Sequence, residues 1–169
     1  MIERALIQRI LKDYRLRLMG THGLPHWGRV LETGLKLAEQ TGANPEVVVL
    51  FAVFHDARRR SETSDPGHGQ RGATLAGKLR GKFLSLSDGD FALLCTACSH
   101  HTDGTTEGDI TVQTCWDADR LDLWRVFITP KDEFLCTPAA KDKSLQGWAC
   151  ERSLADYCPK FVTGEWLSE

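Results

Sequence analysis

The sequence predicts an all-α protein that folds as a single-domain helical bundle. Several segments carry apolar residues at the helical spacings of three and four, and none shows the strict apolar–polar alternation of a half-buried strand. Asn44-Pro45 supplies a helix start, and Gly42 and Gly81 supply helix stops. The chain has 169 residues, which is enough for one domain that buries about two-thirds of its unfolded surface.

The helices are expected, in chain order, at residues 2–19, 26–40, 46–56, 72–81, 88–101, 111–128 and 144–156. The first is amphipathic, with Ile7 and Ile10 on its apolar side. The second places His26 and Val30 on one face, so that His26 looks inward from the first turn. Between the helices, 20–25 and 102–109 are expected to form turns, 61–72 a flexible glycine-rich loop, and 129–140 an irregular segment containing two prolines.

The central segment is an apolar run, residues 46–56, that ends in His55-Asp56. A buried strand is the competing interpretation, because a short apolar run has no decisive period. Asn44 as N-cap and Pro45 at the first helical position favour a helix. A carboxylate at the inner end of a core helix needs a partner, since an unpaired buried charge is costly. A metal ion would satisfy both side chains.

Composition narrows the classes of partner. The formal net charge is −2, which is not the basic character of a nucleic-acid-binding domain, so no duplex partner is expected. The chain has neither a signal-peptide pattern nor an apolar run long enough to span a membrane, and we expect a cytoplasmic protein with no membrane partner. The six cysteines are then expected to be reduced, with Cys95 and Cys98 as core residues.

Four candidate metal ligands stand near the ends of separate expected helices: His26, His55, Asp56 and Asp119. Two imidazoles and two carboxylates suit a divalent ion such as Mn²⁺, Fe²⁺, Ni²⁺ or Zn²⁺, and less readily Mg²⁺. Asp117 is the alternative for the last position.

This order of ligands resembles the H…HD…D signature of the HD-domain superfamily of metal-dependent phosphohydrolases. The flanks agree with it, since His26-Trp-Gly-Arg-Val opens a helix, Val53-Phe-His-Asp closes one, and Ala118-Asp-Arg-Leu-Asp122 carries the last ligand. The resemblance covers roughly residues 20–128, the core of a single HD-type domain (1–169) with a C-terminal extension at 129–169. It implies an all-α bundle in which the four residues bind one ion, and it favours Asp119 over Asp117.

Some members of that superfamily bind a second ion through two further histidines, with the aspartate of the HD pair bridging. His68 and His101 (or His100) stand in the right order for this role. In single-metal members such histidines contact the substrate phosphate, and we favour that interpretation. The Gly-Tyr-Pro motif of the best-known two-metal branch is absent, so cyclic-dinucleotide hydrolysis is not expected.

The expected activity is hydrolysis of a phosphomonoester or nucleotide by a metal-activated water, with His68, His101 and Asp56 as catalytic residues. Phosphoryl transfer needs positive charge and positioning. The candidates for substrate binding are Arg58 with its neighbour Arg59, then Arg71, Arg120 and Asp122. Asp122, one turn after Asp119, would orient a ligand or a sugar hydroxyl, or form a surface salt bridge with Arg120 or Arg125.

Two other functions fit the same residues. One is a non-catalytic HD domain that senses or binds a metal or nucleotide. The other is oxidative chemistry at a di-iron site, which requires His68 and His101 both to be ligands. The expected partner is a small phosphorylated molecule, most simply a nucleotide, and the apolar residues of the first and last helices could serve a homodimer.

Overall fold

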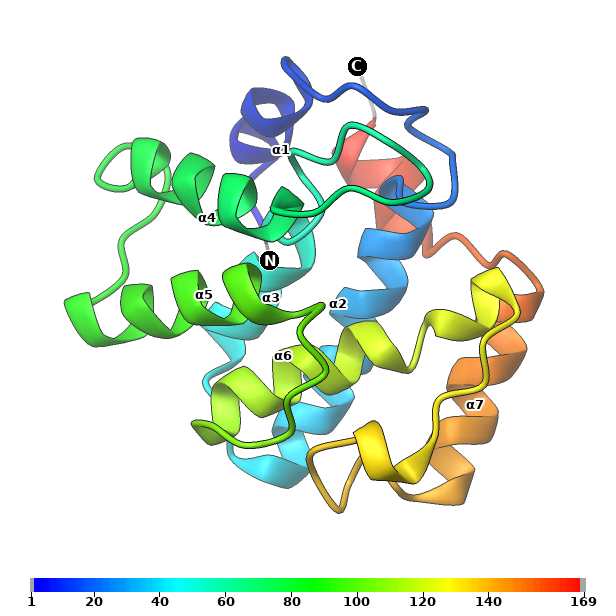
Figure 1. Cartoon of the computed structure of the whole chain (residues 1–169). Helices are drawn as coiled ribbons and strands as arrows, with labels where there is room; N and C mark the ends of the chain where they lie inside the picture. The colour runs from blue at the N-terminus through cyan, green and yellow to red at the C-terminus, as the bar shows by residue number, and fades with distance from the viewer. Residues whose placement is uncertain (1, 168–169) are drawn as a thin grey trace.

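The computed structural model describes residues 2–167, and within them it contains helices but no β-strand (Figure 1). The predicted all-α class is confirmed. The α-helices are α1 (Arg4–Leu11), α2 (Leu24–Thr41), α3 (Pro45–Phe54), α4 (His68–Leu79), α5 (Asp88–His100), α6 (Ile110–Arg120) and α7 (Lys143–Leu154); the short elements are η1 (Leu123–Val126), η2 (Asp132–Phe134) and a π turn, η3 (Val162–Trp166). No helix of this part of the chain has the length and apolar character that crossing a membrane requires.

Helix α3 is the centre of the bundle and packs against α2, α4, α5 and α6. Its start agrees with the sequence prediction: the side chain of Asn44 accepts a hydrogen bond from the backbone N–H of Glu46 at 2.9 Å, and Pro45 is the first helical residue. Almost every residue from Val47 to Phe54 is buried, as expected of a helix that is apolar on all sides. The helix therefore delivers the next two residues, His55 and Asp56, into the interior.

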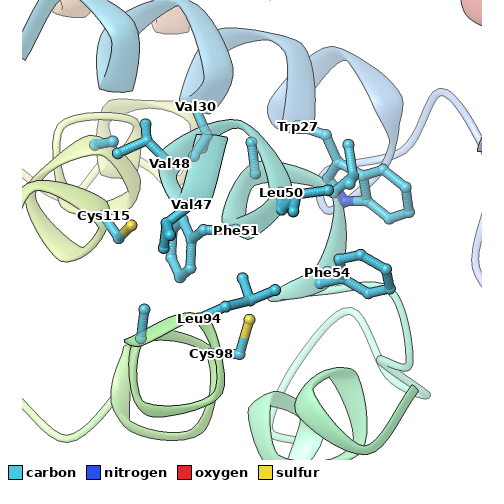
Figure 2. Packing of buried hydrophobic residues seen from close by; sticks show 14 of the residues in the cluster. Trp27, Val30, Val47, Val48, Leu50, Phe51, Phe54, Leu94, Cys98 and Cys115 are labelled. Atoms are coloured by element: carbon cyan, nitrogen blue, oxygen red, sulfur yellow. The ribbon is translucent and has the colours of Figure 1, made fainter. Parts of the chain in front are cut away.

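The core around α3 brings together side chains from four helices (Figure 2). Phe51 and Phe54 of α3 are fully buried, and in this view they lie near Leu94 of α5. Trp27 of α2 is also fully buried, and the T-shaped contact of its ring with Tyr14, at 5.3 Å between centroids, holds the turn before α2 against the bundle. Cys98 is a buried core residue and Cys95 packs against the core, both as free thiols, as predicted.

Helix α4 begins at His68, although the sequence predicted a flexible loop over 61–72 and a helix only from residue 72. Gly69 and Gly72 of this segment allow close packing and do not make it a flexible loop. A Cβ added to Gly69 would lie 2.0 Å from the carbonyl oxygen of Cys98, and one added to Gly72 would lie 2.1 Å from that of Phe54. Because neither residue has a side chain, the first turn of α4 sits directly on α5 and on the end of α3.

Two other predicted helices are shorter in the structure. The segment 2–19 is helical only through Leu11, after which turns carry the chain to α2, and the hydroxyl of Tyr14 donates to the carbonyl of His22 at 2.8 Å. The segment 111–128 is interrupted after Arg120. Asp122 has left the helix (φ −96°, ψ 5°), and its side chain is buried rather than placed on a helix surface. Tertiary contacts outweigh helical periodicity in both places.

Candidate metal centre

The four predicted ligands come together at the inner ends of α2, α3 and α6. The Nε2 atoms of His26 and His55 are 3.0 Å apart. An oxygen of Asp119 lies 3.4 Å from the first of these nitrogens and 3.7 Å from the second. The Oδ2 atom of Asp56 is 3.7 Å from His26 and 3.8 Å from His55. His26, His55 and Asp56 are close enough to hold a metal ion.

A second group of potential ligands adjoins the first and shares Asp56. The Oδ1 atom of Asp56 lies 3.1 Å from Nε2 of His68 and 4.0 Å from Nε2 of His101. The two histidine nitrogens are 2.9 Å apart. Asp56, His68 and His101 are therefore also close enough to hold an ion, and Asp56 turns one oxygen toward each group.

Each of the four histidines has its Nδ1 atom engaged on the side away from the centre. In three of them Nδ1 contacts backbone carbonyls: His55 those of Phe51 and Ala52 (3.1 Å each), His68 that of Asp65 (2.7 Å) and His101 that of Cys98 (2.8 Å). A carbonyl only accepts, so Nδ1 must carry the proton and donate it. A neutral ring then presents a lone pair at Nε2.

The same arrangement holds for His26, whose Nδ1 lies 2.7 Å from a carboxylate oxygen of Asp122. Four Nε2 atoms and two carboxylates are thus directed at each other across short distances. Lone pairs facing each other at 3 Å repel unless protons or cations lie between them. Metal-ligating histidines in proteins are held in this way, with the other ring nitrogen donating to an oxygen. The donor set therefore fits one divalent ion, and its geometry allows two.

The interior environment favours the protonation states that metal binding needs. Burial lowers the pKa of His55 to about 3 and also lowers the pKa of His101. Burial alone would raise the pKa of Asp56, but its electrostatic interactions with the surrounding imidazoles and the hydrogen bond from His68 hold it well below its usual range. His55 and His101 are thus neutral beside an ionised Asp56 at neutral pH, whereas the hydrogen bond with Asp56 and its charge outweigh burial and raise the pKa of His68.

Asp122 holds His26 from behind. Its carboxylate accepts two hydrogen bonds from Arg29, from Nε to Oδ1 at 2.7 Å and from Nη2 to Oδ2 at 3.1 Å, and another from the hydroxyl of Ser153 on α7. Burial alone would raise the pKa of Asp122, but the interaction with His26 and the hydrogen bonds from Arg29 lower it to about 2. The predicted ion pair with Arg125 is present at 3.7 Å, but it does not lie on the surface: Asp122 is buried, and its closest partners are His26, Arg29 and Ser153.

Asp117, the alternative to Asp119, is turned away from the cluster. Its two oxygens accept hydrogen bonds from the backbone N–H groups of Cys136 and Thr137 and from the hydroxyl of Thr137, at 2.7 to 2.8 Å. Asp117 therefore anchors the segment after η2. His100, the alternative to His101, is exposed and lies 2.7 Å from Asp103.

The predicted substrate-binding arginines lie in different surroundings. Arg58 contacts carbonyls of Ile10 and Ala57, and Arg71 pairs with Asp65 at 2.6 Å. Both line a basic hollow of about 360 Å³ with Arg59, Arg60 and other residues. Arg59, which the sequence analysis named only as the neighbour of Arg58, comes closest to the cluster. Its Nη1 atom lies 3.4 Å from Oδ1 of Asp56 and 3.1 Å from Nε2 of His68.

Sequence reasoning missed Arg29 and Ser153. Arg29 follows His26 by three residues and so shares its helix face, a spacing that could have indicated a supporting role. Ser153 left no such signal, because it comes from α7, which only the tertiary fold brings to α2.

Comparisons of this chain with protein-family models, curated proteins and solved structures found no match.

Proposed function

We propose that this protein is a metal-dependent phosphohydrolase that cleaves a phosphomonoester. The observation that carries the proposal is the sharing of Asp56 between two histidine pairs, with all four Nε2 atoms facing the shared carboxylate and all four Nδ1 atoms engaged behind. The resemblance to the HD-domain superfamily adds the reaction type, and it rests on the same residues.

His26, His55, Asp56 and Asp119 would hold the ion, and His68 and His101 would hold a second ion together with Asp56 or contact the phosphate directly. A divalent ion held there lowers the pKa of a water from 15.7 toward about 7 and neutralises phosphoryl charge. The carbonyls and Asp122 behind the four rings keep them from rotating, so the donor atoms need little rearrangement on binding.

The remaining steps need positive charge and a proton donor near the ester. Arg59 supplies a guanidinium beside Asp56 and His68, where a phosphoryl oxygen would sit. As the water oxygen bonds to phosphorus and the ester P–O bond breaks, the departing oxygen takes up a proton. In the form with one ion, His68 would supply it, because its contact with Asp56 outweighs burial and raises the pKa of the ring, whereas burial lowers the pKa of His101.

One further observation favours a second candidate function. The Asp56, His68 and His101 group is what a di-iron centre for oxidative chemistry would need. A non-catalytic metal or nucleotide sensor uses the same pocket without turnover.

The test is hydrolysis of phenyl phosphate, glycerol 2-phosphate and AMP by chelator-treated protein reloaded separately with Mn²⁺, Fe²⁺, Ni²⁺, Zn²⁺ or Mg²⁺. Release of phosphate that is lost in His55→Ala and kept in the exposed control His100→Ala would support the proposal. Metal binding without turnover of any ester would favour the sensor. Two irons per chain with oxygen consumption would favour oxidative chemistry.

A further inference from the structure

The clustered side chains open toward solvent at Asp119. Its side chain is 14% exposed, whereas those of the other five cluster residues are 5% exposed or less. Asp119 and His101 also line a hollow of about 380 Å³. This volume is typical of a site for a small molecule. A ligand that reaches the cluster on the Asp119 side therefore occupies this hollow.

The walls of the hollow are largely apolar and come from the segment after α6. They include Leu123, Ile128, Pro130, Phe134 and Leu135. Ile128 and Phe134 are 53% and 50% exposed, although apolar side chains of this size gain free energy when covered. The threonines of the lining, Thr102 and Thr129, are exposed. An apolar ligand group would bury the two large side chains against the wall.

Arg120 builds this wall and gives it positive charge. Its guanidinium donates to the carbonyl of Phe134 at 2.6 Å and to that of Thr105 at 2.7 Å, so it ties the two sides of the hollow together. These acceptors are neutral, and within residues 2–167 no carboxylate pairs with this guanidinium. Lys131 stands exposed at the same hollow, with the exposed Glu133 as its ion-pair partner at 3.7 Å. The electrostatics suit an anion that carries an apolar group.

We infer that this hollow receives the organic group of the substrate, so that phosphomonoesters of aryl or apolar alkyl alcohols are preferred over those of polar alcohols. The inference rests on the proposed function and names its substrate class. It departs from the nucleotide expected from the sequence, because a nucleobase presents several hydrogen-bonding groups that an apolar wall would leave unpaired. Ile128 and Phe134 are the specificity-determining residues.

Two measurements test the inference. The first is the ratio of kcat/KM for phenyl phosphate to that for glycerol 2-phosphate. The second needs no turnover: the affinity of phenylphosphonate relative to methylphosphonate, measured by calorimetry on metal-loaded protein. The affinity ratio is expected to exceed about tenfold and to fall toward one in Ile128→Ser/Phe134→Ser, and the kcat/KM ratio, which also contains the better leaving group of phenyl phosphate, is expected to fall by about the same factor. Both side chains are half exposed, so the variant should fold, and its unfolding temperature checks this.

The matched control is Phe127→Ser. Phe127 is the adjacent aromatic residue and is 89% exposed, but it lines a different hollow with Trp124 and Arg125. Both ratios should be unchanged in this variant.

The outcomes separate this inference from the proposed function. Hydrolysis of glycerol 2-phosphate as efficient as that of phenyl phosphate would overturn the inference and leave the phosphohydrolase standing. A preference for AMP over phenyl phosphate that survives the double substitution would also overturn it. Tighter binding of phenylphosphonate that depends on Ile128 and Phe134, without hydrolysis of any ester, would keep the apolar hollow and remove the phosphohydrolase.

Discussion

Asp122 lies directly behind His26, with a carboxylate oxygen 2.7 Å from Nδ1 of the ring. The contact fixes which nitrogen of His26 faces the cluster, and Arg29 fixes the carboxylate in turn. Asp122 thereby links the candidate metal centre to the C-terminal part of the chain, because Ser153 of α7 donates to the same carboxylate.

Asp122→Asn should weaken metal binding without removing a ligand. The substitution takes away the charge that orients and polarises His26, and losses of supporting groups of this kind typically reduce metal affinity by about 10- to 100-fold. Titration calorimetry with Mn²⁺ or Zn²⁺ measures the effect. Asp103→Asn, which changes an exposed aspartate beside His100, serves as control. Equal affinities in the two variants would show that Asp122 does not act on the ligand.

Asp56→Asn should weaken both metal groups, whereas His68→Ala should weaken only the group that contains His68. The reason is that Asp56 turns Oδ2 toward His26 and His55 but Oδ1 toward His68. Elemental analysis of ions per chain checks this. If the parent protein binds two ions per chain, we expect one in His68→Ala and none in Asp56→Asn. One ion in the parent that is unaffected by His68→Ala would assign His68 to substrate contact.

Gly69→Ala should destabilise the fold and disturb the second metal group. The new Cβ would lie 2.0 Å from the carbonyl oxygen of Cys98 and 2.9 Å from Nδ1 of His101, so α4 must move away from α5. Overpacking of this kind typically costs about 1–3 kcal/mol. Gly77→Ala on the same helix is the control. Its Cβ would lie 3.8 Å from Phe91, an ordinary contact, and the substitution should stabilise the fold by about 0.5–1 kcal/mol. Denaturant unfolding compares the two, and similar stabilities would contradict the packing argument.

Asp117→Asn should lower stability while leaving metal binding intact. The amide would direct an N–H₂ group at one of the backbone N–H donors of Cys136 and Thr137, which would lose its acceptor. An unsatisfied buried group costs about 1–3 kcal/mol. Thermal unfolding and metal titration are measured together. A loss of metal with unchanged stability would restore Asp117 as a ligand.

Local patterns were sufficient for the helical class and for the centre of the bundle. The apolar run of α3, its Asn44 cap and Pro45 are properties of neighbouring residues. They predict, without any long-range contact, that His55 and Asp56 lie at the inner end of a buried helix. The positions of His26 and Asp119 near helix ends were predicted in the same way. Those four residues do converge.

Other features depended on packing between segments distant in the sequence. Gly69 and Gly72 belong to a stretch with the composition of a loop, and only the proximity of α5 and of the end of α3 makes them a close-packed helix start that brings His68 to Asp56. The sequence left open whether Asp122 orients a ligand or forms a surface salt bridge; Arg29 and Ser153, 93 and 31 residues away, hold it in the interior, behind His26. Helical periodicity records which residues share a face, so the sequence by itself determined the all-helical class, the central helix and the types of candidate ligand. Which carboxylate meets which histidine is set by long-range contacts, and only the tertiary structure decided that.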